Sequence, residues 1–230
     1  MEDFVQSIRA ALAANADPER AVGQQRYMKS AMPYRGLTLP QLRNILRPLL
    51  AARIHSEDDW AASALCLWDE AAYREERYAA IALLRHRHYR RWAGAAPYLE
   101  LYLHLVRTGA WWDLVDEIAA HLVGGVLAAD RVAITPVLLD WARDPDLWVR
   151  RTAILSQIRH RDETDRGLLV ACIEPSLNDR DFFARKAIGW ALREYSKTGD
   201  AAANWVVETV AGLGDQLSPL SRREALKRIA

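Results

Sequence analysis

The sequence predicts an all-α fold, an α-solenoid built from stacked helix pairs, and three observations lead to this. Apolar residues recur at three- and four-residue spacing almost throughout the 230 residues, which is the period of an amphipathic helix. A sustained two-residue alternation, the mark of strands, is absent. Breakers fall at short intervals and cut the chain into roughly a dozen helices.

Several helix starts follow from local sequence. Asp17-Pro18 opens a helix that runs towards Tyr27, and Pro40 suits the first turn of the next helix. Ser221 to Glu224 has the spacing of a capping box. Gly124-Gly125 is expected to interrupt a helix, as paired glycines often do.

The helical segments also recur at a similar spacing. Helices that begin near Tyr73, Trp111, Leu147 and Phe182 are separated by 38, 36 and 35 residues. A period of this length with two helices per unit is typical of an α-solenoid. Because stacked repeats share one continuous core, we expect a single repeat domain over residues 1–230, with a concave face whose curvature suits an extended partner.

Composition excludes several classes of protein. The chain is 51% hydrophobic and 27% charged, so it is neither disordered nor membrane-embedded in type, and no apolar run approaches the ~20 residues that cross a bilayer. Its acidic first residues argue against a signal peptide. Cys66 and Cys172 lie within apolar helical patterns, which favours buried thiols over a disulfide. We expect a cytoplasmic, globular monomer.

The formal net charge of +1 does not by itself indicate a nucleic-acid partner. Positive charge is nevertheless uneven, because the segment from Arg85 to Arg91 holds four arginines and no acid. Such a run is commonly a solvated face. It gains meaning only if other features share its surface.

The helix around Lys186 to Lys197 combines two faces. One face, which includes Ile188 and Leu192, is apolar and suits the core. The other face carries four residues at offsets of four, seven and eleven: Lys186, Trp190, Arg193 and Lys197. Trp190 either packs against a neighbouring helix while the cations extend outwards, or forms an aromatic platform between phosphate-binding charges.

The segment beginning at Trp111 places a carboxylate beside a tryptophan. Trp112 and Asp116 are four residues apart and share one face of a helix. Asp113, near the helix start, is best explained as a cap or a partner of the helix dipole. Asp116 lies too deep in the helix for capping, so it is an exposed acid, a salt-bridge partner or a functional carboxylate.

The third element contains Arg150 and Arg151. One of them should face solvent, and the other could pair with a carboxylate or bind a phosphate bidentately. Trp112, Arg151 and Trp190 are separated by 39 and 39 residues, about one repeat each. This spacing predicts that the three side chains and Asp116 converge on the concave face.

Five segments resemble the AlkD-type DNA alkylation repair glycosylases, which are HEAT-like repeat proteins. They span nearly the whole chain in order and comprise Arg26 to Lys29, Trp111 to Asp116, Trp148 to Leu155, Lys186 to Tyr195 and Leu217 to Ala225. The resemblance implies a concave DNA-binding face and a nucleoid-associated enzyme of base excision repair. It implies excision of cationic N3- and N7-alkylated purines from double-stranded DNA, with no metal or other cofactor and no base flipping.

The same resemblance assigns roles to individual residues. The catalytic aspartate corresponds to Asp116 and the two active-site tryptophans to Trp112 and Trp190. The DNA-contacting arginine corresponds to Arg151, and a tyrosine that touches the duplex to Tyr27. Beside these we expect Lys186, Arg193 and Lys197 to contact DNA, from their place on the cationic helix face.

Two other functions stay open. The first is a non-catalytic HEAT-like binder of DNA structures, for which a carboxylate between two tryptophans would be superfluous. The second is a protein-binding solenoid, in which Trp112 and Trp190 dock a peptide or belong to the core. DNA affinity that falls steeply with salt would separate this last function from the other two.

Overall fold

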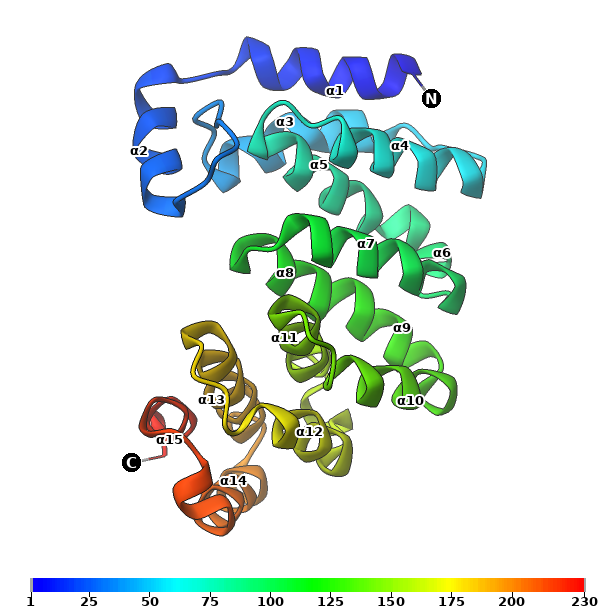
Figure 1. Cartoon of the computed structure of the whole chain (residues 1–230). Coiled ribbons are helices and arrows are strands. Elements are labelled where there is room, and N and C mark those ends of the chain that lie inside the picture. Colours follow the sequence, from blue (N-terminus) through cyan, green and yellow to red (C-terminus); the bar gives the residue numbers. More distant parts are fainter. Residues whose placement is uncertain (1, 230) are drawn as a thin grey trace. The chain divides into compact units, whose positions relative to one another are not determined.

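The structure, a computed structural model, describes residues 2–229, whose regular secondary structure is all helical with no β-strand among them. The predicted all-α fold of stacked helix pairs is confirmed. The chain divides into two compact units, residues 1–93 and 94–230 (Figure 1). None of the helices in the described part of the chain is long and apolar enough to cross a membrane.

Unit 1 packs its first helix against three later ones. Its helices are α1 (Glu2–Ala14), α2 (Pro18–Met28), α3 (Leu39–Ala51), α4 (Glu57–Asp69), α5 (Arg74–Leu84) and the short α6 (Arg90–Ala93). Helix α1 contacts α3, α4 and α5 and buries Val5, Ile8 and Leu12 against them. The start of α2 after Asp17 and the start of α3 after Thr38 confirm the sequence predictions.

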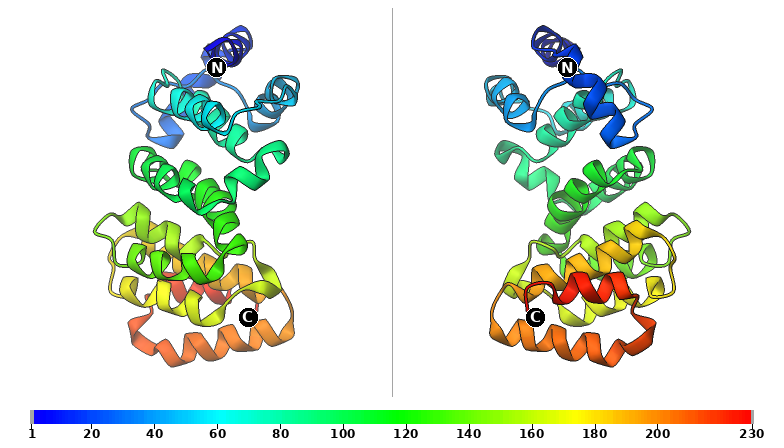
Figure 2. Two further views of the ribbon diagram at one scale, coloured as in Figure 1. Left: turned by 90° about the vertical axis from the view of Figure 1, so that its right-hand side faces the viewer. Right: turned by 90° about the vertical axis from the view of Figure 1, so that its left-hand side faces the viewer.

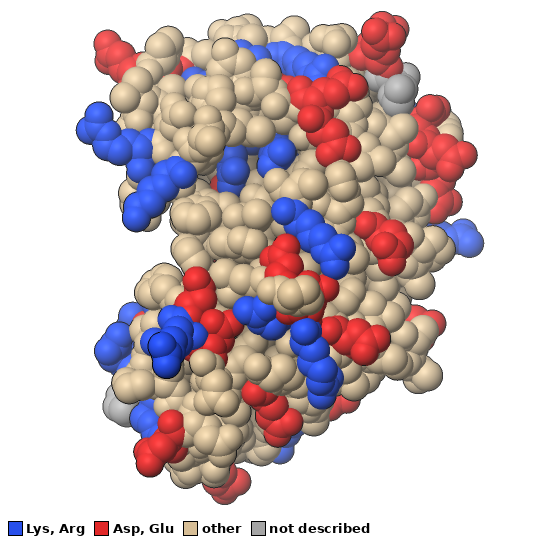
Figure 3. All heavy atoms as spheres, viewed as in Figure 1, with Lys and Arg blue, Asp and Glu red and all other residues tan. Residues whose placement is uncertain are grey.

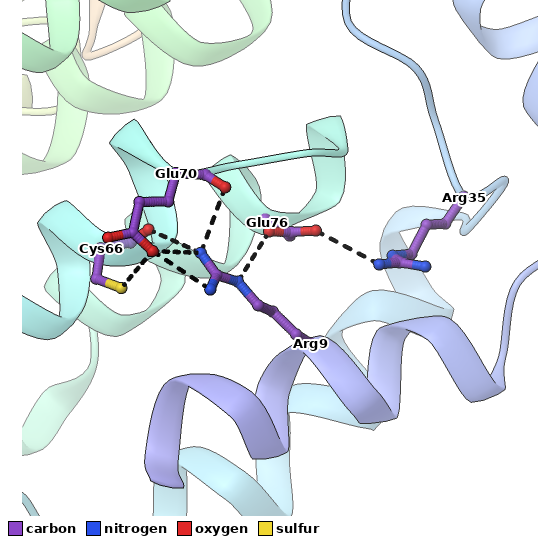
Figure 4. Close-up of polar contacts among 5 residues, drawn as sticks. All are labelled: Arg9, Arg35, Cys66, Glu70 and Glu76. Carbon is purple, nitrogen blue, oxygen red and sulfur yellow. Dashed lines mark hydrogen bonds and ion pairs between the residues drawn. The ribbon is translucent and has the colours of Figure 1, made fainter. Parts of the chain in front are cut away.

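A polar network fixes α1 against α4 and α5 (Figure 4). The Arg9 guanidinium donates to the Cys66 carbonyl oxygen at 3.1 Å and to a Glu76 carboxylate oxygen at 3.1 Å, and it also pairs with Glu70. The other Glu76 oxygen lies 3.5 Å from Arg35. Since the Glu76 side chain is buried, its charge is held by these two cations.

Unit 2 stacks helix pairs in successive layers (Figure 2). Its helices are α7 (Leu99–Gly109), α8 (Trp112–Glu117), α9 (Gly124–Ala129), α10 (Arg131–Trp141), α11 (Leu147–Leu155), α12 (Arg166–Ile173), α13 (Phe182–Ser196), α14 (Asp200–Leu213) and α15 (Pro219–Leu226). Helix α11 packs on α8 and on α13, and α13 packs on α14 and α15. The apolar face predicted for α13, with Ile188 and Leu192, is buried.

The helix starts show the repeat directly. Helices α8, α11 and α13 begin at Trp112, Leu147 and Phe182, 35 residues apart each time. Identical turns precede the last two. Asp144 accepts a hydrogen bond from the Asp146 N–H, and Asp179 accepts one from the Asp181 N–H. Asp146 and Asp181 in turn cap α11 and α13. Recurrence of whole hydrogen-bonded turns identifies these segments as repeats.

Gly124 lies at a junction that the sequence suggested would break a helix. Instead α8 passes through a π-helical segment, Ile118–Val123, into α9, so the expected interruption is wrong. A Cβ on Gly124 would lie 2.4 Å from the Ser156 carbonyl oxygen, so glycine permits the close approach of the chain after α11. The Gly124 carbonyl accepts from His160 Nε2 at 2.9 Å.

The start of the last helix also differs from the prediction. The N-cap of α15 is Ser218, whose hydroxyl accepts from the Ser221 N–H. The spacing from Ser221 to Glu224 therefore does not mark a capping box, because Ser221 already lies inside the helix. Its hydroxyl donates to the Arg185 carbonyl oxygen on α13.

Candidate functional site

The central feature of unit 2 is an ion pair between neighbouring repeats. Arg151 on α11 donates from Nε to Asp116 Oδ1 at 2.7 Å and from Nη2 to Asp116 Oδ2 at 2.8 Å. Its Nη1 donates to the Phe183 carbonyl oxygen at 2.6 Å, at the start of α13. Three successive repeats therefore meet at this guanidinium, and the carboxylate is held in one orientation.

Burial sets the electrostatics of the pair. The side chains of Arg151 and Asp116 are 4% and 14% exposed, so water stabilises the carboxylate poorly. Burial raises the pKa of Asp116, and the hydrogen bonds and charge of Arg151 offset part of that rise. A carboxylate has about four lone-pair sites, so the two oxygens keep acceptor capacity beyond the Arg151 bonds.

The two adjacent arginines both have protein partners. Of the alternatives left open for them, Arg151 takes the carboxylate pairing, and a direct phosphate contact by this side chain stays a prediction. Because Arg151 is buried, the sequence predicts that Arg150 faces solvent. Instead it is half-buried, donates to the Asp144 and Pro145 carbonyls and pairs with Asp179 at 2.7 Å.

An aromatic cluster lies beside this pair, at the starts of α8, α11 and α13. The Trp111 ring lies 5.9 Å from that of Trp148 and 5.3 Å from that of Phe183, between ring centroids. Phe182 adds an exposed ring next to Phe183. Trp112, the first residue of α8, is half-buried one helical turn before Asp116.

The repeat register corrects the proposed equivalence of Trp112, Arg151 and Trp190. Because the helices begin 35 residues apart, the position equivalent to Asp116 is Arg151, and the next is Lys186. The spacing of 39 residues joins positions one helical turn out of register. Trp190 therefore lies one turn beyond Lys186, the equivalent of Asp116, and two turns beyond Phe182, the equivalent of Trp112. The polar contacts of the described residues do not join Trp190 to Asp116.

Two cations on the predicted face of α13 share one acidic partner, which sequence analysis missed. Glu224 on α15 is buried, and its carboxylate pairs with Lys186 at 2.7 Å and with Arg193 at 2.5 Å. These partners lower the pKa of Glu224, with the Lys186 hydrogen bond as the largest cause. No local motif marks Glu224 as a partner, because the pairing depends on how α15 packs.

Packing of α13 on α15 depends on Gly189. A Cβ there would lie 2.5 Å from the Glu224 Cβ and 2.6 Å from the Ser221 carbonyl oxygen. The missing side chain lets the two helices approach closely, and this approach brings Glu224 to the cations.

Trp190 has a polar partner on its own helix. Its indole Nε1 donates to Glu194 Oε1 at 3.0 Å, and the same oxygen pairs with Lys197. The Trp190 side chain is half-buried. Its partner Glu194 fixes one edge of the indole, so the ring has a defined orientation beside Lys197.

Tyr27 belongs to unit 1. It lies near the end of α2 and is 78% exposed, which leaves its ring open to a ligand. Figure 3 shows Lys and Arg side chains projecting where α2 lies, whereas in unit 2 charges of both signs alternate on the same view. Acidic side chains therefore offset part of the positive charge of the predicted DNA contacts on α13.

Comparisons with known proteins agree with this architecture. Residues 8–229 match the model of the DNA alkylation repair enzyme family. The structure is similar to one described as a predicted DNA alkylation repair enzyme from Enterococcus faecalis, with 27% identity, a TM-score of 0.79, and 94% of this chain and 97% of that chain covered. No curated protein matches.

The fold and the family match define a helical-repeat protein of DNA repair. The chain belongs to the DNA alkylation repair enzyme family. Membership supports a role in DNA repair, with DNA as the molecule that it binds.

Proposed function

We propose that this protein is a DNA glycosylase that hydrolyses the N-glycosidic bond of cationic N3- and N7-alkylated purines in double-stranded DNA, without base flipping. The observation that carries the proposal is the Asp116 carboxylate. It is partly buried, fixed by two Arg151 hydrogen bonds and set beside a half-buried tryptophan. A carboxylate held in this way suits a reaction that develops positive charge.

The substrate explains why so few groups suffice. A purine alkylated at N3 or N7 already carries a positive charge, so it departs as a neutral base and needs no general acid. As the bond to the deoxyribose breaks, positive charge moves onto the sugar and an oxocarbenium-like centre forms. Water then adds to the anomeric carbon and loses a proton, which leaves an abasic site and the free alkylated base.

Asp116 performs two tasks in this scheme. Its negative charge stabilises the sugar cation, and a free lone pair accepts a hydrogen bond from the attacking water. Arg151 is a positioning residue, since it holds both carboxylate oxygens and ties them to the Phe183 carbonyl. In a site of low polarity, this fixed orientation avoids reorganisation when charge develops.

Trp112 and Trp190 supply aromatic faces. Indole rings attract cations, by about 0.5–2 kcal/mol for each ring, so they favour the cationic sugar over the neutral one. The Glu194 hydrogen bond orients the Trp190 ring. A site that recognises the sugar avoids part of the few kcal/mol that base flipping requires.

The remaining residues hold the duplex. Exposed Tyr27 contacts the DNA backbone from unit 1, and Lys186, Arg193 and Lys197 donate to phosphates from α13. Glu224 and Glu194 orient these cations, and a phosphate then competes with the carboxylates for them. Arg151 reaches a phosphate only through N–H groups that its three hydrogen bonds leave unused.

The test is base release from methylated duplex DNA by the wild-type chain, by Asp116→Asn and by Asp113→Asn. Asp116→Asn keeps the shape of the side chain but loses its charge, so it should bind the DNA and release methylated purines at least about a hundredfold more slowly. Asp113→Asn, on the same helix, should retain most activity.

Two outcomes would contradict the proposal. Normal DNA binding by the wild type without any base release would favour the non-catalytic DNA binder. Full activity of Asp116→Asn would mean that another carboxylate carries the reaction.

A further inference from the structure

A cationic pocket lies in unit 1, outside the candidate site. Its volume is about 610 Å³, and it is lined by Arg53, Ile54, His55, Arg87, His88, Tyr89, Arg90 and Trp92. These residues come from the loop between α3 and α4 and from the arginine-rich segment around α6. The pocket thus accounts for part of the positive run between Arg85 and Arg91.

Aromatic packing gives the pocket a fixed frame. The Tyr89 hydroxyl accepts from the Ile54 N–H at 2.8 Å and so joins the two segments. The Tyr89 and Trp92 rings are stacked with centroids 5.4 Å apart, and both contact the fully buried Trp60. The backbone that carries the cations is therefore anchored in the core of unit 1.

The charges of the pocket are uncompensated. No carboxylate lines it, and Arg53, Arg87 and Arg90 are exposed and make no ion pair with any residue in the range 2–229. His88 Nδ1 is buried and lacks a hydrogen-bond partner within that range. By contrast, the cations of α13 are paired with Glu224 and Glu194.

Burial and the charges of Arg53 and Arg87 lower the pKa of His88. The same two guanidinium groups that disfavour a charged His88 favour an anion placed between them. Cations that line one pocket without acids repel one another, and an anion bound among them would reduce that repulsion.

We propose that this pocket is a second DNA-contacting site, which binds a backbone phosphate between Arg53, Arg87 and Arg90. Arginine suits phosphate because its planar N–H groups donate two parallel hydrogen bonds. The half-exposed Trp92 ring beside them offers a face for a sugar or a base. This proposal needs only one part of the proposed function, namely that the protein binds DNA.

The pocket is distinct from the predicted contact at Tyr27. Helices α2 and α6 lie at opposite sides of unit 1 (Figure 1). A phosphate held near α6 is therefore a separate contact that adds to affinity without touching Asp116, which belongs to unit 2. Its loss should weaken binding and leave the chemical step unchanged.

The test compares Arg87→Ala/Arg90→Ala with a matched control, Arg43→Ala/Arg47→Ala. The control removes two exposed arginines of the same unit from α3, outside the pocket. Binding of unmodified duplex DNA is measured by fluorescence anisotropy over a series of salt concentrations. The pocket variant should bind about tenfold more weakly, with a salt slope smaller by about 1–2, whereas the control should match the wild type.

A second measurement separates DNA phosphate from free phosphate. Inorganic phosphate is titrated into the wild-type protein, and the ring signals of His55 and His88 are followed by NMR, with chloride at equal ionic strength as the reference. Shifts with phosphate alone, together with weaker DNA binding by the pocket variant, support the proposal.

Unchanged DNA binding by the pocket variant would overturn the proposal, and phosphate-dependent shifts would then identify a site for free phosphate. An equal loss in the control would also overturn it, because the effect would be one of net charge. Since unmodified DNA is used, these results do not depend on whether the protein releases alkylated bases.

Discussion

Arg151 and Asp116 occupy equivalent positions of neighbouring repeats and bind each other through two hydrogen bonds of 2.7 and 2.8 Å. The pair places a carboxylate between helices α8 and α11 with both oxygens fixed. Each side chain is mainly buried, so substitution of Arg151 changes the pKa of Asp116.

Substitution of Arg151 should move the pH dependence of base release. In the proposed reaction, base release requires the Asp116 carboxylate, so the activity is present above the pKa of Asp116 and is lost as pH falls through that value. Arg151 lowers this pKa against the effect of burial. Arg151→Gln should therefore shift the acidic limb of the pH–rate profile to higher pH, as measured in single-turnover reactions, and Arg151→Lys should shift it less. An unmoved limb in a folded Arg151→Gln protein would contradict the positioning role.

Loss of either aromatic face should slow the chemistry more than the binding. If each indole stabilises the sugar cation by about 0.5–2 kcal/mol, Trp112→Leu and Trp190→Leu should each reduce the single-turnover rate by roughly 2- to 30-fold. Phe at either position should restore part of the rate. Trp205→Leu on α14 provides a control, and a similar loss there would indicate a general effect on folding.

Glu224 should stabilise unit 2 in a pH-dependent way. Its pKa is lowered in the folded state, so its contribution is present above the unfolded pKa and is lost as pH falls through the folded one. Glu224→Gln should reduce the free energy of unfolding by ~1–3 kcal/mol at neutral pH. Thermal melts at neutral and strongly acidic pH would check this, since the difference from wild type should shrink in acid.

The paired glycines offer a matched comparison of packing. In Gly124→Ala the new Cβ would lie 2.4 Å from the Ser156 carbonyl oxygen, whereas nothing lies within 4 Å of a Cβ on Gly125. Gly124→Ala should destabilise the protein by ~1–3 kcal/mol, and Gly125→Ala should stabilise it by ~0.5–1 kcal/mol. Chemical denaturation gives both values, and equal effects would argue against the close approach.

Sequence periodicity predicted most of the fold, because amphipathic helices and their starts depend on local patterns. Asp17-Pro18 and Pro40 marked their helices correctly. The prediction of a helix break at Gly124 is wrong, because the missing side chain permits close packing against Ser156 within a continuous helical segment. Whether the chain folds as one domain stays a prediction, beside the two compact units observed.

The candidate site was predicted less completely. Family resemblance selected Asp116 and Arg151, but only packing of α11 on α8 brings them into contact. The predicted spacing of 39 residues is one helical turn longer than the 35 residues that separate the helix starts, so it does not join equivalent positions. Glu224 was missed, since its role depends on the fit of α15 against Gly189.

The contacts of the Arg151 guanidinium determine the smallest fragment of the chain that could hold the Asp116 carboxylate in place. Its acceptors lie on α8 and at the start of α13, so the carboxylate depends on residues from three consecutive repeats. A truncated chain that ends before Phe183 would keep Asp116 and Arg151 yet lose the third anchor. The proposed catalytic geometry is thus a property of three stacked repeats, and no single helix pair contains it.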